Sequence, residues 1–322
     1  MSEAPAAIAH VMAVVVHYAG LEDTRACLAS LEPALDPGSI VLVDNSEDGE
    51  GLALARRELP GVVALGDHSN LGFAAGSNLG IRHALEMGAT HVLLLNPDAL
   101  LERGALEPLL ESARDPLVGI VGGKVLLLPK EAGERRIASA GCGHDFLWLT
   151  HSRGEGALDG PPWDTACDVD FVSGCFALVR RDVLEKVGLL DERFFLYYED
   201  ADLCERARRA GFRVRYEPGA VAWHRVHGAL LAAPRDVGPM VSYYSTRNQI
   251  LYAQRRLWRG LALGAFLVLL LLRRTVRAAI ELAHGHPDRA MAHGCGFRDG
   301  LLARTGKAPR GAWPGIRVRR PG

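Results

Sequence analysis

The chain has 322 residues, of which 48% are hydrophobic and 23% charged, so it is long enough to bury a sizeable core as one large or two small domains. The formal net charge of −1 hides an asymmetry. Residues 246–322 carry 15 Lys and Arg against 3 Asp and Glu, which leaves 22 basic and 35 acidic residues in 1–245. This division predicts an acidic body and a basic C-terminal region that meets something anionic.

Two further features exclude a secreted, disulfide-stabilised protein. The six cysteines form no CxxC pair and no zinc-binding spacing, which predicts reduced thiols in a cytosolic protein. The N-terminus has no basic segment ahead of its first apolar run, Val11 to Val16, and that run leads straight into the predicted fold. We therefore expect no signal peptide.

Short apolar runs alternate with stretches of helical spacing over the first hundred residues. Strands are predicted at 11–16, 40–43, 62–65 and 91–95. Helices are predicted at 21–31, 51–59 and from the glycine-rich segment 70–78 to about 87. This rhythm is typical of an α/β fold with a mostly parallel sheet, in which ligands bind beyond the carboxyl ends of the strands. No GxGxxG follows the first strand, so a dinucleotide-binding site is not expected.

The second half of the body is less regular. Residues 119–128 and 175–179 predict two more strands, and 212–216 predicts a strand at an edge of the sheet. Residues 129–163 are polar, rich in glycine and without periodicity, which is typical of a functional loop or an acceptor-side insertion.

An acidic stretch precedes the last predicted helix of the body. Glu199, Asp200 and Asp202 interrupt apolar residues, and burying a charge without a partner is expensive, so packing does not explain them. Residues from Leu203 predict a helix that ends near Gly211, which puts the three carboxylates at or before its first turn, where the helix dipole favours them. An acidic helix start paired with arginines and a catalytic group are both open interpretations here.

The C-terminal region combines apolar and basic residues. The 12 residues from Leu261 to Leu272 carry no charge, and three arginines stand on each side of them. Because spanning a bilayer takes roughly 20 apolar residues, we expect a monotopic or re-entrant helix at an anionic membrane surface. A buried core helix, or one in a homodimer interface, is the alternative. Residues 304–322 predict a basic, disordered tail.

Several separated motifs resemble one family. They are Val15-Val16-His17-Tyr18, Val41-Leu42-Val43-Asp44-Asn45-Ser46, Asn70-Leu71-Gly72-Phe73-Ala74, Leu94-Leu95-Asn96-Pro97-Asp98, and Gly188-Leu189-Leu190-Asp191-Glu192 continuing into Tyr198-Glu199-Asp200-Ala201-Asp202-Leu203. In this order they make residues 10–250 resemble the family 2 inverting glycosyltransferases with a GT-A fold, especially the rhamnosyltransferase-like branch. The resemblance implies a Rossmann-like, mostly parallel sheet flanked by helices.

The resemblance implies a nucleotide-sugar donor at the strand ends, with Asp44 at its base or ribose. The nucleotide-sugar-binding residues that it implies are His17, Tyr18, Asp44, Asn45, Asn70, Gly72, Phe73, Asn78, Asn96 and Gly174. The favoured donor is dTDP-L-rhamnose, with UDP- and GDP-sugars behind it. Ala19 departs from the pattern, because the family usually has Asn there.

A divalent cation, Mn²⁺ or Mg²⁺, is also implied, bridging the donor's diphosphate. Asp98 and His224 are the implied protein ligands, with His227 as the alternative to His224. Oxygen ligands and phosphate suit such hard cations, and an imidazole favours Mn²⁺ somewhat. Asn96 stands where some relatives have the first carboxylate of an Asp-x-Asp motif.

Asp200 resembles the family's general base, which takes the proton of the acceptor hydroxyl as that hydroxyl attacks the anomeric carbon. Glu199 is then expected to position the acceptor, and Asp202 to cap the helix. Inversion in one step needs this one carboxylate and a stabilised leaving group, so no covalent nucleophile is required.

These implications predict an inverting glycosyltransferase that adds a sugar to a growing lipid-linked glycan at the cytoplasmic face of the cell membrane, with no nucleic-acid partner. We expect a catalytic domain over 1–245, a helical membrane-associating region over 246–303 and a tail over 304–322. Two alternatives stay open. One is a sugar nucleotidyltransferase, whose basic, glycine-rich signature is missing after the first strand. The other is a degenerate glycosyltransferase-like binding subunit.

Overall fold

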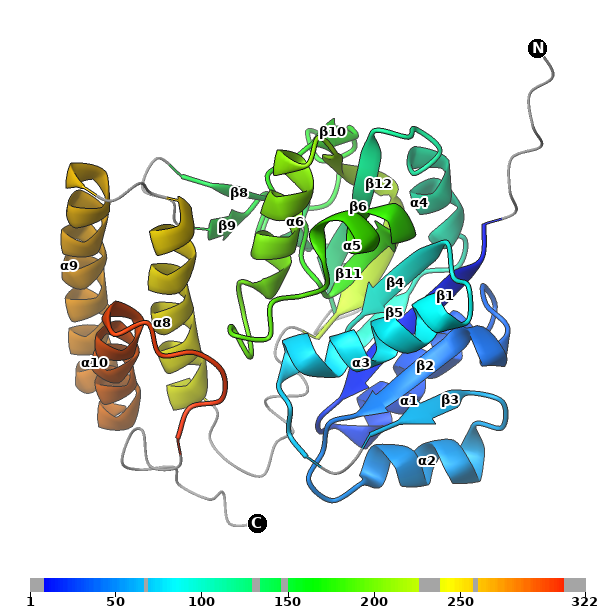
Figure 1. Ribbon diagram of the computed structural model, residues 1–322, viewed down its shortest axis with the longest axis horizontal. Coiled ribbons are helices and arrows are strands. Elements are labelled where there is room, and N and C mark those ends of the chain that lie inside the picture. Colours follow the sequence, from blue (N-terminus) through cyan, green and yellow to red (C-terminus); the bar gives the residue numbers. More distant parts are fainter. Residues whose placement is uncertain are drawn as a thin grey trace.

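The computed structural model describes residues 9–66, 69–128, 134–145, 150–225, 238–256 and 260–309. It consists of a sheet with helices on both faces and a group of three longer helices at one end (Figure 1). The predicted α/β class is confirmed, and the polar segment at 129–163 contributes short strands in its described part.

One mixed sheet forms the body. Its strands are β1 (Val11–His17), β2 (Ile40–Asp44), β3 (Val63–Leu65), β4 (His91–Leu95), β5 (Ala99–Leu101), β6 (Val118–Leu127), β7 (Ile137–Ser139), β10 (Cys167–Asp168), β11 (Phe176–Arg180) and β12 (Arg213–His224). The order is β10-β12-β6-β11-β4-β1-β2-β3, with β5 beside β12 and β7 beside β6. Because β1 is parallel to both β2 and β4, the polar segments after these three strands meet at one edge of the sheet.

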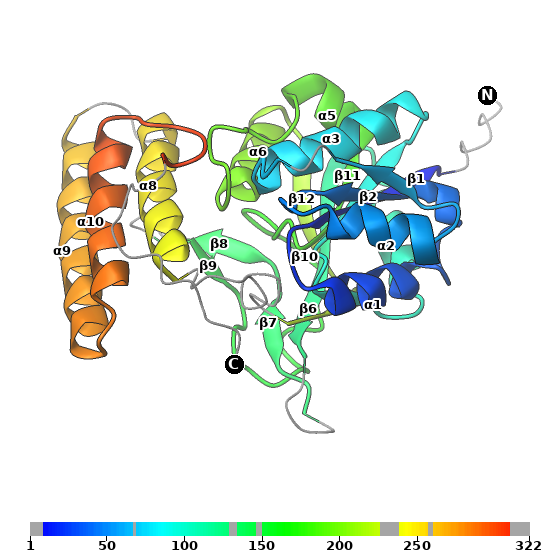
Figure 2. The same cartoon turned by 90° about the horizontal axis from the view of Figure 1, so that it is seen from below.

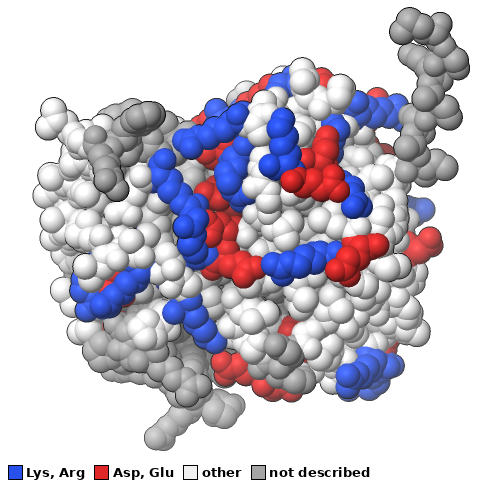
Figure 3. Space-filling model, viewed as in Figure 1, with Lys and Arg blue, Asp and Glu red and all other residues white. Residues whose placement is uncertain are grey.

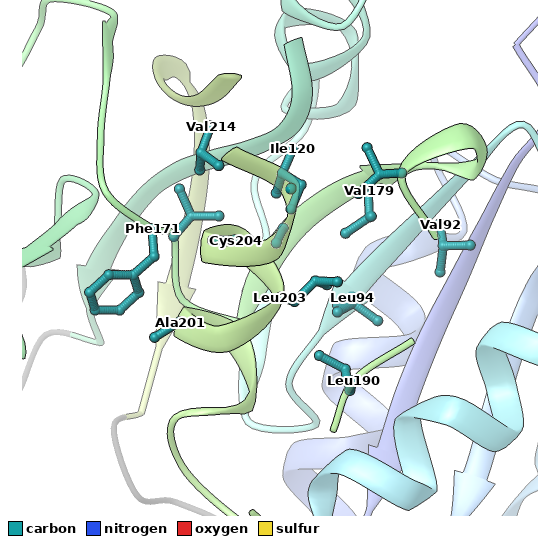
Figure 4. Packing of buried hydrophobic residues seen from close by; sticks show 14 of the residues in the cluster. Val92, Leu94, Ile120, Phe171, Val179, Leu190, Ala201, Leu203, Cys204 and Val214 are labelled. Atoms are coloured by element: carbon teal, nitrogen blue, oxygen red, sulfur yellow. The ribbon is translucent and has the colours of Figure 1, made fainter. Parts of the chain in front are cut away.

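Helices cover both faces because the central strands are apolar on both sides. In β1, Val11, Ala13 and Val15 belong to the core under α1 (Leu21–Leu31), α2 (Glu50–Glu58) and α4 (Leu106–Ser112). The alternate residues Met12 and Val14 belong to the core under α3 (Phe73–Glu86), α5 (Arg181–Val187) and α6 (Glu199–Arg209). Figure 4 shows Leu203 of α6 beside Leu94 of the sheet. A continuous apolar run is what a strand buried on both faces requires.

The expectation of an edge strand at 212–216 was wrong. β12 has 12 residues and lies between β6 on one side and β10 and β5 on the other. The sequence hides this length because Pro218 and Gly219 interrupt the apolar pattern, and the strand accommodates them with a register shift between Glu217 and Val221. β12 consequently reaches His224 at the edge where the site lies.

The C-terminal group consists of α8 (Gly238–Arg256), α9 (Leu261–Ala283) and α10 (Pro287–Leu301). A hairpin of β8 (Cys142–His144) and β9 (Thr150–Ser152) reaches from the body towards α8 (Figures 1 and 2). A short 3₁₀ helix, η1 (Pro37–Ser39), precedes β2 in the body. Tyr252 of α8 stacks on His144 with ring centroids 5.5 Å apart, and its hydroxyl lies 3.0 Å from the imidazole Nε2. The expected domain boundary after residue 245 falls inside α8, so the division of the chain stays a prediction.

Helix α9 has a largely apolar outer surface. Only Phe266, Leu270 and Glu281 of its 23 residues are buried, whereas Leu261 is 95% exposed and Leu272 is 59% exposed. The face of this end of the molecule that Figure 3 shows is correspondingly poor in charged side chains. Among the described residues, no helix is both long and apolar enough to cross a membrane.

Candidate active site

A cavity of about 550 Å³ lies where the strand ends of the sheet meet the β8–β9 hairpin and helices α8 and α9. Its wall includes most of the residues singled out from the sequence. These are Tyr18, Asn45, Asn70, Gly72, Phe73, Asn96, Asp98, Gly174, Glu199, Asp200 and His224. Residues more than 200 positions apart in the chain are thus brought to one place.

Asp98 and His224 lie together at one part of this wall. The Nε2 atom of His224 is 3.0 Å from Oδ1 of Asp98, and the Asp98 side chain is buried. Asn96 is beside them, with its Nδ2 atom 3.4 Å from the same imidazole nitrogen. The other amide atom, Oδ1 of Asn96, is buried and has no hydrogen-bond partner in the described part of the chain. A carboxylate, an imidazole and an unsatisfied amide oxygen form a donor set that fits a divalent cation.

These groups do not enclose a metal by themselves. The described residues contain no cluster of three or more His, Cys, Asp and Glu side chains that could hold one. Asp98 and His224 therefore provide two protein ligands, and further ligands would have to come from a bound molecule. His227, the alternative ligand considered from the sequence, lies outside the described residues.

Glu199 and Asp200 open helix α6 with their carboxylates at the cavity. Asp200 accepts hydrogen bonds from the backbone N–H of Gly174, at 3.0 Å, and of Ala201, at 2.7 Å. Glu199 is buried, and its Oε2 atom has no partner in the described structure. Burial raises the pKa of both carboxyl groups, and for Glu199 the neighbouring charge of Asp200 raises the pKa further. Raised pKa values are typical of carboxylates that transfer protons.

The backbone just before α6 is strained. Phe195, Tyr197 and Tyr198 have φ angles of 66°, 69° and 75°, a left-handed conformation that costs energy for residues other than glycine. The strained turn directs Glu199 and Asp200 into the cavity instead of continuing the preceding chain direction. Such conformations persist only where the surroundings hold them in place.

Two residues of α8 hold this turn. Nδ2 of Asn248 donates to the carbonyl oxygens of Phe194, Leu196 and Tyr197 at 2.7–2.9 Å. Arg247 is buried to 1% exposure and donates from Nη2 to the Phe194 carbonyl oxygen at 2.7 Å. The C-terminal helices therefore form part of the active-site structure.

The glycine-rich segment is fastened to the same turn. The N–H of Phe73 donates to the carbonyl oxygen of Phe195 at 2.7 Å, and Asn45 bonds the backbone of both Leu71 and Gly72. A side chain on Gly72 would place its Cβ 2.4 Å from the Phe195 ring, and the glycine has φ 87°, so only glycine fits there. The segment that opens α3 thereby sets the distance between the two walls of the cavity.

Three of the predicted donor-binding residues are not on the cavity wall that the described residues form, and their side chains hydrogen-bond to other parts of the protein. His17 is fully buried, with Nδ1 2.8 Å from Thr24 Oγ1. The carboxylate of Asp44 accepts from the backbone and hydroxyl of Ser46 and from the N–H of Leu52. Asn78 exchanges hydrogen bonds with the backbone of Leu190 at 2.8 and 3.0 Å. In this structure these three groups hold the walls together.

Sequence reasoning missed the contribution of the C-terminal helices to the cavity. Ser245 and Gln249 of α8 line it, as do Arg273 and Arg274 of α9. The arginine pair gave a visible signal, because it ends an apolar run of 12 residues, but we interpreted it only as the flank of a membrane helix. No local pattern indicates that α8 contacts a turn about 50 residues earlier.

Comparison with known proteins identifies the family of the chain. Residues 11–235 match the family model described as "Glycosyltransferase like family 2". The chain is 31% identical over 311 residues to the N-acetylglucosaminyl-diphospho-decaprenol L-rhamnosyltransferase of Mycobacterium tuberculosis, covering 84% of this chain and 97% of the relative. It is 26% identical to the low-salt glycan biosynthesis hexosyltransferase Agl10 of Haloferax volcanii, over 62% of each chain.

Solved structures show the same fold at low sequence identity. The mannosyltransferase PcManGT of Pyrobaculum calidifontis, solved in complex with GDP-Man and Mn²⁺, superposes with a TM-score of 0.53 at 16% identity, covering 93% of this chain and 89% of that one. A family model that matches residues 11–235, which include the whole sheet, places the chain among the family 2 glycosyltransferases, and the GT-A architecture agrees with this.

Proposed function

We propose that this glycosyltransferase moves a sugar, with inversion, from a nucleotide-sugar donor to a hydroxyl group of a lipid-linked glycan. The favoured donor is dTDP-L-rhamnose, ahead of UDP- and GDP-sugars, because two similar proteins are named rhamnosyltransferases. The observation that carries the proposal is the pairing, within one cavity, of Asp98 and His224 with the carboxylate of Asp200. Inverting transfer needs a leaving-group site and one base, and these groups can supply both.

The base would be Asp200. Its two backbone hydrogen bonds, from Gly174 and Ala201, fix the carboxylate, so that it can take the proton from an acceptor hydroxyl at the cavity. The hydroxyl oxygen then forms a bond to the anomeric carbon as the bond to the nucleoside diphosphate breaks on the opposite face. Glu199 is placed to hydrogen-bond the acceptor with the Oε2 atom that has no protein partner among the described residues.

A divalent cation fits the other part of the cavity. Asp98 and His224 would hold it, and Asn96 offers a further oxygen. When bound, Mn²⁺ or Mg²⁺ would neutralise charge that develops on the departing diphosphate. The residues around it would bind and orient the donor: Tyr18, Asn45, Asn70 and Phe73 line the neighbouring wall.

The exposed surface of α9 supports the proposed acceptor class and cellular location. Its exposed apolar residues and adjacent arginines suit the surface of an anionic membrane, where the apolar face enters the headgroup layer and the guanidinium groups contact phosphate. A peripheral position on the cytoplasmic side would bring the cavity to a lipid-linked acceptor. The mycobacterial relative is named for a diphospho-decaprenol acceptor, which supports an acceptor of this class.

A donor-binding experiment tests this proposal. We expect one of dTDP-rhamnose, a UDP-sugar or a GDP-sugar to raise the thermal unfolding temperature, and Mn²⁺ to enlarge the shift. His224→Ala should lose the part of the shift that depends on Mn²⁺, whereas His284→Ala, on the exposed end of α9, should retain it. No stabilisation of the wild-type protein by any nucleotide sugar, with or without Mn²⁺, would contradict the proposal.

A further inference from the structure

Two adjacent arginines of α9, Arg273 and Arg274, line the cavity. Neither forms an ion pair with an acidic side chain in the described structure, although Arg277, one turn further on, pairs with Glu281 at 3.1 Å. Nη2 of Arg274 donates to Oε1 of Gln249 at 2.8 Å, while its Nε is buried and makes no hydrogen bond within the described residues. Arg274 is partly buried, and a guanidinium group removed from water without an ionic partner is costly unless an anion binds it.

The electrostatic environment of Arg274 supports this interpretation. Burial lowers the pKa of its guanidinium, and the like charges of Arg273 and Arg277 lower the pKa further. The arginines also act on Tyr198, the residue directly before Glu199: burial raises the pKa of the Tyr198 hydroxyl, and the charges of Arg274 and Arg273 oppose that rise. The positive charge therefore lies close to the turn that carries the carboxylates.

We propose that Arg273 and Arg274 form the subsite for the diphosphate of a prenyl-diphosphate-linked acceptor. The inference rests on the proposed function, and it assigns the acceptor's anionic group to named residues. Arginine suits this role because its planar guanidinium binds phosphate oxygens in pairs. The donor's diphosphate has its own expected place at Asp98 and His224, so the arginines serve the second anion that such a reaction brings to the cavity.

The sequence around the arginines also suits the prenyl chain. Leu269, Leu272 and Val276 are exposed apolar residues spaced so that they share one side of α9, and they flank Arg273 and Arg274 in the chain. A lipid whose diphosphate is bound by the arginines can therefore lay its hydrocarbon chain along an apolar surface. The acceptor sugar, on the other side of the diphosphate, would extend into the cavity towards Asp200.

Binding of farnesyl diphosphate to the full-length protein, measured by calorimetric titration, tests the subsite. We expect wild-type protein to bind farnesyl diphosphate and not farnesol. The double variant Arg273→Gln, Arg274→Gln should lose affinity at least tenfold, and Arg277→Gln, on the same helix but outside the cavity wall, should bind like wild type. All variants should keep the thermal stabilisation by a nucleotide sugar with Mn²⁺. The single variant Arg273→Gln should also bind farnesyl diphosphate more weakly than wild type. Because Arg273 is exposed, this loss of affinity does not come from misfolding.

Three outcomes would overturn the inference. The first is equal binding of farnesyl diphosphate by the double variant and wild type, or no binding by wild type. The second is loss of the thermal stabilisation by a nucleotide sugar in the double variant, which would show that the arginines bind the donor. The third is loss of binding to phosphatidylglycerol vesicles with unchanged binding of farnesyl diphosphate, which would make them membrane-headgroup contacts. If farnesyl diphosphate binding depends on the arginines while no nucleotide sugar stabilises the protein, the subsite stands and the proposed function fails.

Discussion

The sheet and helix α9 place their apolar side chains in opposite ways. All seven residues of β1 are buried, and its alternate residues enter two different cores. In α9, which begins with an uncharged apolar run, only three of 23 residues are buried. Val268, Leu272 and Val276 are all more than half exposed. The strand therefore buries its apolar side chains inside the fold, whereas α9 leaves most of its apolar side chains at the surface.

The two regions also divide the cavity between them. The strand ends contribute Asn96, Asp98 and His224, whose positions follow from hydrogen-bonded registers of the sheet. The helical group contributes Ser245, Gln249 and the arginine pair. In the proposed function, the metal ligands of the donor site lie at strand ends, whereas the acceptor side includes residues of the helical group. The turn before α6, which carries the proposed base, is hydrogen-bonded to α8 and to the glycine-rich segment.

Replacing the base should have the largest effect. Asp200→Asn keeps the size of the side chain but cannot take a proton, so we expect turnover to fall about 10²–10⁴-fold, the contribution of a positioned base. Nucleotide-sugar binding with Mn²⁺ should be unchanged. The matched control is Asp202→Asn, two residues further along α6, because that carboxylate pairs with Arg206 and Arg255. Its turnover should stay within a few-fold of wild type, and unimpaired turnover in Asp200→Asn would remove the base assignment.

Loss of the helical support for the turn should have the second largest effect. Asn248→Ala removes three hydrogen bonds to the strained backbone before Glu199, so we expect kcat to fall about 10–100-fold, as misplacement of catalytic groups does. KM for the donor should change less than kcat, because Asp98 and His224 lie at strand ends of the sheet, whereas the glycine-rich segment of the proposed donor site contacts the turn. Gln254→Ala, on the same helix but bonded to Gly300, is the control. Equal losses in kcat and in donor affinity would show that the turn acts on both sides of the cavity.

The sheet was predictable because its signals are local. Strands β1, β2, β4, β6 and β11 begin and end within one residue of the apolar runs that predicted them. Their polar C-terminal loops locate Asn96 and Asp98 at the cavity, since such loops meet at one edge of the sheet. Helix α6 itself was also predictable, because arginines near its end and acidic residues near its start complement the helix dipole, although it begins at Glu199 and not near Leu203.

The remaining parts depend on contacts between distant residues. Asp44 resembled a donor ligand by motif, yet both its oxygens bond to groups within eight residues, and nothing in its local pattern distinguishes the two uses. Asn248 gave no signal, because its partners are backbone carbonyl groups more than 50 residues away. The exposure of α9 was undecided for a similar reason: a run that is apolar on every side has the same pattern in a core as at a surface.

Reducing the apolar surface of α9 should weaken membrane binding. We expect the triple variant Val268→Ser, Leu272→Ser, Val276→Ser to partition at least tenfold less onto anionic vesicles, because each side chain gives up apolar area that would leave water on binding. Folding stability should change little, since the three positions are exposed. Met87→Ser, at an exposed position of the sheet region, controls for a general loss of hydrophobicity. Unchanged partitioning, measured by vesicle flotation, would favour an interface with a second copy of the chain.

The smallest expected effect concerns Glu199, whose carboxylate destabilises the fold that presents it. Burial raises the pKa of Glu199 in the folded protein, so the unfolded chain releases this proton at lower pH than the folded protein does. The free energy of unfolding therefore falls as pH rises from the pKa of the unfolded chain through that of the folded protein. Glu199→Gln has no proton to release, so it should be more stable than wild type at pH 8, by about 1 kcal/mol, and no more stable at pH 4. Urea unfolding at both pH values measures the difference. Glu205→Gln, which loses ion pairs to Arg208 and Arg209 on the same helix, should not gain stability at pH 8. A stability difference that does not depend on pH would mean that burial of the ionised Glu199 carboxylate does not destabilise the folded protein. The turn before α6 would then not lower stability in favour of activity.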